Sequence, residues 1–275
     1  MATPEQSPLG KTSSYIDEYD ASLLFPISRL EKRLELGIDG QLPFQGVDIW
    51  NAYELSWLNS KGKPVVALAE FFIPVGSPNL VESKSFKLYL NSFNQTKFDS
   101  LQAVQNRLEA DLTAAAGSDV HVTVVYLHQA GSSADIGAFD AVCIDELDVD
   151  IEHYSTQPNM LKASADQIVS EKLVSHLLKS NCLVTGQPDW GSVIIEYTGA
   201  KIDHEALLKY LISFRQHNEF HEQCVERIFT DLMGHCHCET LTVYARYTRR
   251  GGLDINPFRT NVDGAQPENV RLVRQ

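Results

Sequence analysis

One pentapeptide occurs twice in the chain, as Tyr89-Leu90-Asn91-Ser92-Phe93 and as Tyr210-Leu211-Ile212-Ser213-Phe214, with agreement at four of five positions. Each copy is followed by a further phenylalanine, Phe98 or Phe220, and lies between an expected strand pair and an expected long helix. A match this short can arise by chance, so the shared context decides the interpretation. We interpret it as an internal duplication.

The first half alternates strand and helix patterns. Apolar residues at three-to-four spacing predict helices, and alternation of apolar with polar residues predicts strands. A glycine directly after the last apolar position of a helix pattern marks its end. The expected elements are a helix over 27–36, a strand pair over 50–58 and 65–73, a helix over 100–116 and a strand over 120–127.

The second half repeats this order of elements. We expect a strand beginning at 183–184, a strand over 192–197, helices over 204–214 and 221–233, and a strand over 240–247. A turn follows at 249–252, and the tail from residue 257 is polar. Two such halves, with antiparallel strand pairs and helices on one face, predict an α+β architecture.

Composition divides the chain into four parts. We expect a polar N-terminal arm over 1–20, a first half over 21–140, an acidic linker over 141–165 and a second half over 166–275. The linker carries four aspartate or glutamate residues within the hexapeptide Asp145-Glu146-Leu147-Asp148-Val149-Asp150.

Charge and composition exclude several classes of protein. The 275 residues include 23 Lys or Arg and 36 Asp or Glu, for a net charge of −13, which argues against direct nucleic-acid binding. No run of about 18 apolar residues predicts a membrane span, and the start lacks the pattern of a secretory signal. Five cysteines are an odd and sparse set. We therefore expect a cytoplasmic protein with reduced thiols.

Cys182 lies in the most informative segment, which continues through a Gly-Gln-Pro turn to Asp189, Trp190 and Gly191. A nucleophilic cysteine needs partial exposure, and an acid across a turn can fold back to within proton-transfer distance. The alternative is a buried core cysteine with Asp189 capping its own turn. Spacing alone favours the alternative.

His221 and Glu222 form a second candidate group. A histidine can carry protons near neutral pH, and a carboxylate can accept two N–H donors from a purine-like base. The alternative is an ordinary helix start, where the macrodipole favours Glu222. Without further information this alternative is preferred.

Two basic segments are candidates for phosphate binding. Lys84 and Lys87 share a helix face, although a solvated helix start with Glu82 in its first turn explains them equally. Arginines at 246, 249 and 250 are followed by two glycines, whose backbone N–H groups can approach an anion.

Other motifs argue against common sites. The segment His235-Cys236-His237-Cys238 resembles a metal cluster, but successive strand residues point to opposite faces, so we expect packing residues. The chain has no G-x-G-x-x-G and no Walker A motif, so a Rossmann or P-loop site is not indicated. The sequence assigns no role to Cys143, Cys224, Cys236 and Cys238.

Taken together, the segments resemble the NADPH-dependent 7-cyano-7-deazaguanine reductases, in their longer two-half form. The similarity covers roughly residues 20–275, and the segment Glu-Ser-Lys-Ser-Phe-Lys is the family's signature. The matching segments are 82–87, 180–182, 187–191, 220–222 and 249–257, in this order.

The resemblance implies a fold and a reaction. The fold would be a tandem of tunnelling-fold halves, which usually form barrels, so a homodimer is expected. The reaction would reduce the nitrile of a deazapurine to a primary amine, a step toward the queuosine base of tRNA. A thiolate adds to the nitrile carbon to give a thioimide, which accepts hydride more readily, and two NADPH are used in turn.

The resemblance also implies residue roles. Cys182 would be the nucleophile, Asp189 the proton donor to the nitrile nitrogen, and His221 an aid to proton movement. The signature lies in the first half and Cys182 in the second, so the resemblance places the site where halves or subunits meet. The implied substrate contacts are Val81, Glu82, Ser83, His221 and Glu222, the implied NADPH contacts are Ser83, Lys84, Arg250 and Gly251, and no metal is expected.

Two other functions stay open at this point. One is a hydrolase of the same fold, which would need a metal cluster or a water-activating base beside the cysteine. The other is a non-catalytic module that binds a purine-like ligand without any dependence on Cys182.

Overall fold

The computed structural model describes residues 15–131 and 136–275. Most of the expected N-terminal arm, 1–14, therefore lies outside the described residues. The chain forms two compact units, and each is described by itself. Unit 1 comprises Met1–Leu34, Val47–Asp135 and Arg249–Ile255, and unit 2 comprises Glu35–Gly46, Ile136–Thr248 and Asn256–Gln275.

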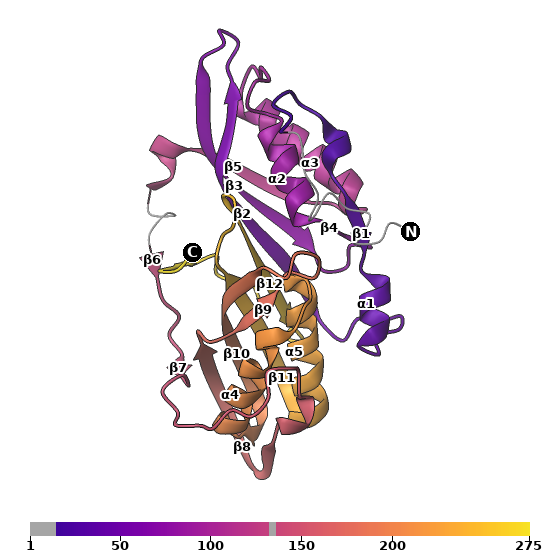
Figure 1. The fold of residues 1–275 in the computed structure, drawn as a ribbon, viewed down its shortest axis with the longest axis vertical. Helices are drawn as coiled ribbons and strands as arrows, with labels where there is room; N and C mark the ends of the chain where they lie inside the picture. The colour runs from indigo at the N-terminus through magenta and orange to yellow at the C-terminus, as the bar shows by residue number, and fades with distance from the viewer. Residues whose placement is uncertain (1–14, 132–135) are drawn as a thin grey trace. The chain divides into compact units, whose positions relative to one another are not determined.

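The strands of unit 1 form an antiparallel sheet in the order β5-β3-β2 (Figure 1). The expected strand pair is confirmed, since Trp57 pairs with Val65 in the β2–β3 ladder. A separate short ladder joins β1 to β4. The strands are β1 (Pro26–Ser28), β2 (Gln45–Leu58), β3 (Pro64–Pro74), β4 (Asn79–Val81) and β5 (His121–Tyr126).

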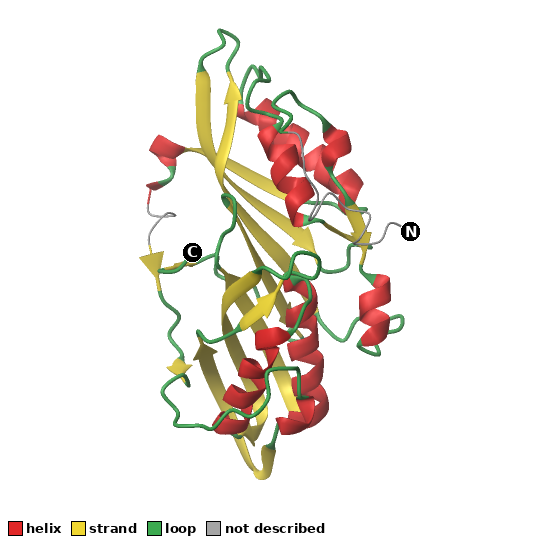
Figure 2. Ribbon diagram, viewed as in Figure 1, coloured by secondary structure: helices red, strands yellow, loops and turns green. Residues whose placement is uncertain are grey.

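Two helices, α2 (Ser83–Asn91) and α3 (Leu101–Ala116), lie over one face of this sheet (Figure 2). The helix expected over 100–116 is confirmed, and its ends follow from local chemistry. The Ser100 side chain caps the first turn by accepting from the N–H of Ala103 at 3.1 Å. Gly117 ends the helix with a φ of 72°, a conformation that favours glycine.

The helix expected over 27–36 is wrong in its extent and in its buried face. Ile27 is buried, but it belongs to β1 and pairs with Leu80. The helix α1 covers only Leu30–Glu35, and Leu30 and Leu34 are each 48% exposed. Pairing of β1 with β4 supplies hydrogen-bond partners to the backbone around Ile27. The spacing of apolar residues gives no sign of this distant strand, so it predicted a helix.

Unit 2 contains a sheet in the order β12-β11-β10-β8-β7 (Figure 1). The pairs are antiparallel except for β7, which runs parallel to β8. Helices α4 (His204–Ser213) and α5 (His221–Cys236) lie over one face of the sheet. The strands are β7 (Val142–Cys143), β8 (Ala163–Ser175), β9 (Lys179–Asn181, paired with β10), β10 (Pro188–Ile202), β11 (Cys238–Tyr247) and β12 (Leu253–Thr260).

Two expectations for the second half are wrong. Residues 183–184 lie in a turn, and the short strand β9 precedes them. The tail expected to be polar from residue 257 begins instead inside a buried strand, because every residue of β12 is buried, and residues 261–274 that follow are mostly exposed or half-buried. Arg259, one of the two charged residues of β12, is compensated by Glu226 of α5, with Nη2 and Oε1 2.9 Å apart. The polarity of a short segment does not predict a buried ion pair of this kind, because the partner lies far away in the sequence.

The two copies of the pentapeptide have equivalent partners, each within its own unit. The hydroxyl of Tyr89 donates to Oδ2 of Asp111 at 2.7 Å, and that of Tyr210 donates to Oδ2 of Asp231 at 2.6 Å. Both tyrosines lie on the first helix of their unit's pair and both aspartates on the second. Burial, together with the neighbouring aspartate, raises the pKa of each tyrosine.

The serines of the pentapeptide repeat this equivalence. Ser92 donates to the carbonyl of Tyr89 at 2.6 Å, and Ser213 donates to the carbonyl of Tyr210 at 2.6 Å. Two units therefore carry the same helix-to-helix contact, which supports the duplication. The expected α+β class with antiparallel sheets is confirmed. Within the part of the chain that the structure describes, no helix is long and apolar enough to cross a lipid bilayer.

Candidate functional site

Cys182 begins the tight turn that links β9 to β10 in unit 2. Its N–H donates to the carbonyl of Gln187 at 2.8 Å, and its carbonyl accepts from the N–H of Gly186 at 3.0 Å. Gly186 has a φ of 65°, which a side chain would disfavour. The turn therefore returns the chain and starts β10 directly beside β9.

The strand register places Asp189 near Cys182. Asp189 pairs with Ser180 across the two strands. Cys182 follows Ser180 by two residues and so continues the same face of the hairpin. Cys182 and Asp189 are 5% and 4% exposed, respectively. The structure thus brings the predicted nucleophile and the predicted acid to one buried face.

The expectation of a partly exposed thiol is wrong for this chain. The hairpin is bonded along its edge to the segment before α5: the N–H of Asn181 donates to His217, and the N–H of Glu219 donates to Asn181, at 2.8 and 3.1 Å. Cys182 itself is buried, at 5% exposure. The same two bonds bring the start of α5, with its His-Glu pair, next to the cysteine segment.

His221 is the first residue of α5 and faces Asp189. Its Nε2 lies 3.7 Å from Oδ1 of Asp189, and both side chains are largely buried. The imidazole packs edge to face on Tyr247, with ring centroids 4.1 Å apart at 86°. This packing fixes the ring beside the acid, so the two groups can exchange a proton after a small movement.

Glu222 lies in the first turn of the same helix and is 2% exposed. The N-cap residue of α5 is Phe220, whose side chain makes no capping hydrogen bond. A carboxylate is favoured at that position by the helix macrodipole. The burial of Glu222 beside His221 agrees with a ligand contact as well as with a helix start.

Glu219 anchors the segment that carries these residues. Its carboxylate accepts from Nε2 of His217 at 2.9 Å and from Nη2 and Nε of Arg227 at 2.7 and 3.0 Å. Burial raises the pKa of Glu219, but the bonds from His217 and Arg227 outweigh burial and lower the pKa to about 2. The ionised carboxylate therefore stabilises the folded state at neutral pH.

We expect Glu219→Gln to lower the free energy of unfolding by about 3 kcal/mol at pH 7, given about 1.4 kcal/mol per pKa unit. Because the folded pKa is depressed, the contribution is present above the unfolded pKa near 4.5 and is lost as pH falls toward 2. Urea denaturation at pH 7, 5 and 3 measures the difference in free energy of unfolding between the native protein and Glu219→Gln, which should become smaller as the pH falls. Glu152→Gln, at an exposed position, is the control, and a pH-independent difference would contradict this account.

The sequence did not single out several polar neighbours of Asp189. Tyr247 is fully buried, and burial raises its pKa, with Cys224 and Asp189 nearby. Burial likewise raises the pKa of the Cys224 thiol, with Ser180 close to it. The side chain of Gln223 is buried, and neither its amide nitrogen nor its oxygen has a partner among the described residues. The sequence contains one indication of these residues: the apolar alternation over 240–247 places Tyr247 on the buried face of β11.

Glu82 begins a second group, in unit 1. It precedes α2, and its carboxylate accepts from the N–H of Lys84 at 2.7 Å and of Ser85 at 2.8 Å. The residue is fully buried. Burial raises the pKa of Glu82, and the two backbone N–H groups oppose this rise. Glu82 thus acts as the buried N-cap of α2, whereas the alternative interpretation expected it in the first turn of a solvated helix start.

Glycines bring the arginine segment against the signature segment within unit 1. Gly251 has a φ of 59°, and a Cβ built on it would lie 3.3 Å from Cδ of Lys87. The N–H of Arg250 donates to the carbonyl of Leu253 at 3.0 Å and closes the turn. The guanidinium of Arg249 lies over the ring of Tyr53, 4.6 Å from its centroid.

Val81, Ser83 and Lys84, the other expected contacts of this segment, lie at the junction of β4 and α2. Val81 is buried at the end of β4, while Ser83 and Lys84 are half-buried in the first turn of α2. Lys87 therefore lies beside the glycine turn that follows Arg250 in unit 1.

Arg246 does not belong to that basic group. It is 1% exposed in β11 of unit 2. Its Nε donates to Oε1 of Gln275 at 3.0 Å, and its Nη1 donates to Oδ1 of Asn269 at 2.7 Å. These contacts assign it to the packing of the C-terminal segment.

The segment 235–238 does not converge on one point. Cys236 and Cys238 are buried, whereas His235 and His237 are exposed. His237 has a φ of 52° and separates α5 from β11. Burial raises the pKa of the two thiols to about 12 and about 11, so they stay protonated packing groups at neutral pH.

Comparison with known proteins matches both halves of the chain. Residues 15–124 match the family model described as nitrile reductase, 7-cyano-7-deazaguanine-reductase N-term, and residues 188–266 match the model described as QueF-like protein. Three relatives carry the name NADPH-dependent 7-cyano-7-deazaguanine reductase. They come from Chromobacterium violaceum (62% identical, covering 100% of this chain and 98% of the relative), Cupriavidus taiwanensis (63%, 100% of both) and Burkholderia multivorans (58%, 99% of both).

Proposed function

Because the chain belongs to the 7-cyano-7-deazaguanine reductase family, we propose that it reduces the nitrile of 7-cyano-7-deazaguanine to the aminomethyl group with NADPH. One observation carries this proposal for the chain itself. Cys182 and Asp189 share one buried face of a hairpin, and His221 lies 3.7 Å from Asp189. This is a thiol nucleophile with an acid and a proton carrier beside it.

Cys182 opens the reaction by adding to the nitrile. A nitrile has no leaving group and its carbon is a modest electrophile, so direct hydride transfer is slow. The sulfur reacts as the thiolate, its proton already lost: it forms a C–S bond, one carbon–nitrogen π bond breaks, and the electron pair goes to nitrogen. Asp189 gives its proton to that nitrogen, and the product is a covalent thioimide.

His221 supports the acid. Its Nε2 faces the Asp189 carboxyl, and Tyr247 holds the ring in place. An imidazole in this position can return a proton to Asp189 once the acid has donated. The buried setting of both groups keeps bulk water from competing for the proton.

The basic group of unit 1 fits an anionic cofactor. Ser83, Lys84, Arg250 and Gly251 would supply hydroxyl, ammonium, guanidinium and backbone donors, and this assignment is supported by the contact of Lys87, in the same signature, with Gly251. We assign the phosphates of NADPH to these residues. When bound, NADPH supplies hydride, and the four-electron change from nitrile to amine uses two equivalents.

Two carboxylates are assigned to the guanine-like edge of the substrate. Glu222 and Glu82 are both buried at helix starts, where a carboxylate can receive the ring N–H and the exocyclic amine as a paired contact. Val81 and Ser83 flank Glu82 and complete the assignment. Glu82 retains acceptor capacity, because a carboxylate offers about four lone-pair sites, and two backbone N–H groups and the Ser83 hydroxyl use three of them.

The family supplies the wider setting. Its fold is the tunnelling fold in two halves, in agreement with the repeated tyrosine–aspartate contact. The substrate is a small molecule, and the product leads toward the queuosine base of tRNA. The homodimer, the cytoplasmic location and the lack of direct nucleic-acid binding stay predictions.

The product of the reaction tests this function. We expect NADPH oxidation that depends on the nitrile, two equivalents for each amine formed, and no consumption with the nitrile omitted. Mass spectrometry of the small-molecule product distinguishes amine from carboxylic acid. Formation of the carboxylic acid without NADPH would show that the protein is a hydrolase and not a reductase. Binding of the nitrile without turnover would show that it is a non-catalytic module.

A further inference from the structure

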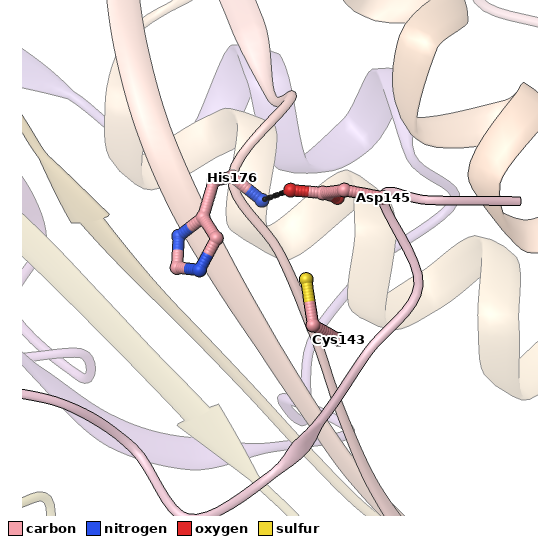
Figure 3. Close-up of side chains that lie close together, drawn as sticks. All are labelled: Cys143, Asp145 and His176. Atoms are coloured by element: carbon pink, nitrogen blue, oxygen red, sulfur yellow. Dashed lines mark hydrogen bonds between the residues drawn. The ribbon is translucent and has the colours of Figure 1, made fainter.

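Three residues of unit 2 that have no role in the proposed reaction place metal-ligating atoms together. The thiol of Cys143, the carboxylate of Asp145 and the imidazole of His176 offer atoms that all lie within 4.8 Å of one another. Figure 3 shows these side chains around one point. Of the five cysteines, all within the described residues, Cys143 alone is exposed.

The backbone that carries these residues is fixed by strand pairing. The strand β7 runs parallel to β8, with Cys143 opposite Val174. The N–H of Ile144 then donates to the carbonyl of Val174 at 3.0 Å. Cys143 at the end of β7 and Asp145 two residues after it are thereby held beside His176, which directly follows β8.

Asp145 is oriented by two hydrogen bonds. Its Oδ1 accepts from Oγ of Ser175 at 2.6 Å, and its Oδ2 accepts from the backbone N–H of His176 at 2.9 Å. A carboxylate offers about four lone-pair sites, so these bonds leave capacity for a cation. They also hold the carboxylate at its place beside the imidazole, as supporting hydrogen bonds do in metal sites.

His176 is oriented through its other ring nitrogen. Nδ1 lies 2.8 Å from Oγ of Ser192. This contact leaves Nε2 for a ligand and fixes the ring plane, which is the arrangement common for metal-binding histidines. The backbone carbonyl of His176 accepts from Nη2 of Arg274 at 2.8 Å, so the loop is held as well.

The same three residue types can form a catalytic triad, but the geometry argues against one. In a triad the acid bonds the imidazole nitrogen that faces away from the nucleophile. Here Asp145 accepts a hydrogen bond from the backbone N–H of His176 and not from its ring. The ring nitrogen Nδ1, which the acid of a triad would bond, is partnered by Ser192 instead. The cluster is therefore arranged as a set of ligands and not as a proton relay.

We propose that Cys143, Asp145 and His176 bind a divalent transition metal of the zinc class. Sulfur, nitrogen and oxygen donors suit a tetrahedral Zn²⁺, and a water would take the fourth position. Metal–ligand bonds of about 2.0–2.3 Å require the three atoms to approach one another slightly. Cys143 and His176 are exposed, so rotation of their side chains achieves this, with loss of the thiol proton on binding.

A metal at this point would fasten β7 to the end of β8. Unit 2 would then be stabilised by an amount that rises with the logarithm of the free metal concentration above the Kd, since the ligands are together only in the folded state. The site is separate from Cys182 and does not depend on the proposed reductase activity.

The test uses the full chain with Cys182→Ala, which removes the other candidate thiol, and Co²⁺ as the spectroscopic probe. We expect a sulfur-to-cobalt charge-transfer band, displacement by Zn²⁺, and a rise of the melting temperature with added Zn²⁺. In this background Cys143→Ser abolishes the band, and His176→Gln weakens binding at least about tenfold, within the range for loss of metal-site residues.

The matched control is His153→Gln, which removes another exposed histidine of unit 2 and leaves the band and the affinity unchanged. Melting curves without metal show whether each variant is folded. A charge-transfer band that persists in Cys143→Ser, or no Co²⁺ binding at all by the folded Cys182→Ala chain, overturns the proposal.

Discussion

Replacement of Cys182 by alanine should abolish both turnover and covalent capture of the nitrile. Without NADPH, the native protein is expected to gain the full mass of 7-cyano-7-deazaguanine, because addition of a thiolate to a nitrile expels nothing. The variant should gain no mass, and its turnover should fall by at least about 10⁴-fold, as for other lost nucleophiles. Intact-protein mass spectrometry and an NADPH-oxidation assay measure the two effects.

Cys143→Ala is the matched control for the adduct, since it removes an exposed thiol and leaves Cys182 in place. The added mass should persist in this variant. An adduct that survives Cys182→Ala, or turnover close to that of the native protein, would rule out the thioimide route.

Replacement of Asp189 by asparagine should slow adduct formation by about 10²- to 10⁴-fold, the usual contribution of a positioned acid. The amide keeps the shape of the side chain but cannot donate the proton that the nitrile nitrogen needs. Because Asp189 is 4% exposed, water cannot easily substitute for it. The rate of mass gain without NADPH isolates this step from hydride transfer.

Asp166→Asn, at an exposed position of β8, controls for the loss of one negative charge in unit 2. A thermal melt of Asp189→Asn separates an effect on chemistry from an effect on folding. If a folded Asp189→Asn chain forms the adduct at the native rate while His221→Ala does not, the imidazole and not the carboxyl is the proton donor.

Prediction of the fold succeeded where burial follows from local periodicity. The helix over 101–116 has its buried residues Val104, Leu108 and Leu112 on one stripe, with Ser100 and Gly117 at its ends. A periodic pattern with both ends marked leaves little freedom in assignment. The pentapeptide repeat went further, because it predicted two related units before any contact was known.

The same method failed where a distant partner decides the environment. Ile27 is buried through a ladder with Leu80, and Leu30 and Leu34 are left exposed. Arg259 lies fully buried because Glu226 compensates its charge. Neither partner lies within the window that a local pattern covers, so apolar spacing placed Ile27 in a helix and composition placed Arg259 in a polar tail.

For the candidate site, the sequence identified the segments that carry the reacting groups, and the structure showed which of these groups lie next to one another. Spacing alone favoured a core role for Cys182, and only the family motifs reversed that preference. The register of β9 with β10 places Asp189 on the face of Cys182, and the edge bonds of Asn181 bring His221 beside them.

The sequence by itself determined the duplicated α+β plan, the family and the chemical types of the reacting groups, because these depend on residue identity and short-range order. Only the tertiary structure decided which groups meet: the acid facing His221, the burial of the thiol, and the gathering of Cys143, Asp145 and His176 at the ends of two paired strands. Proximity between residues far apart in the chain arises from strand register and packing, and no local pattern encodes that register.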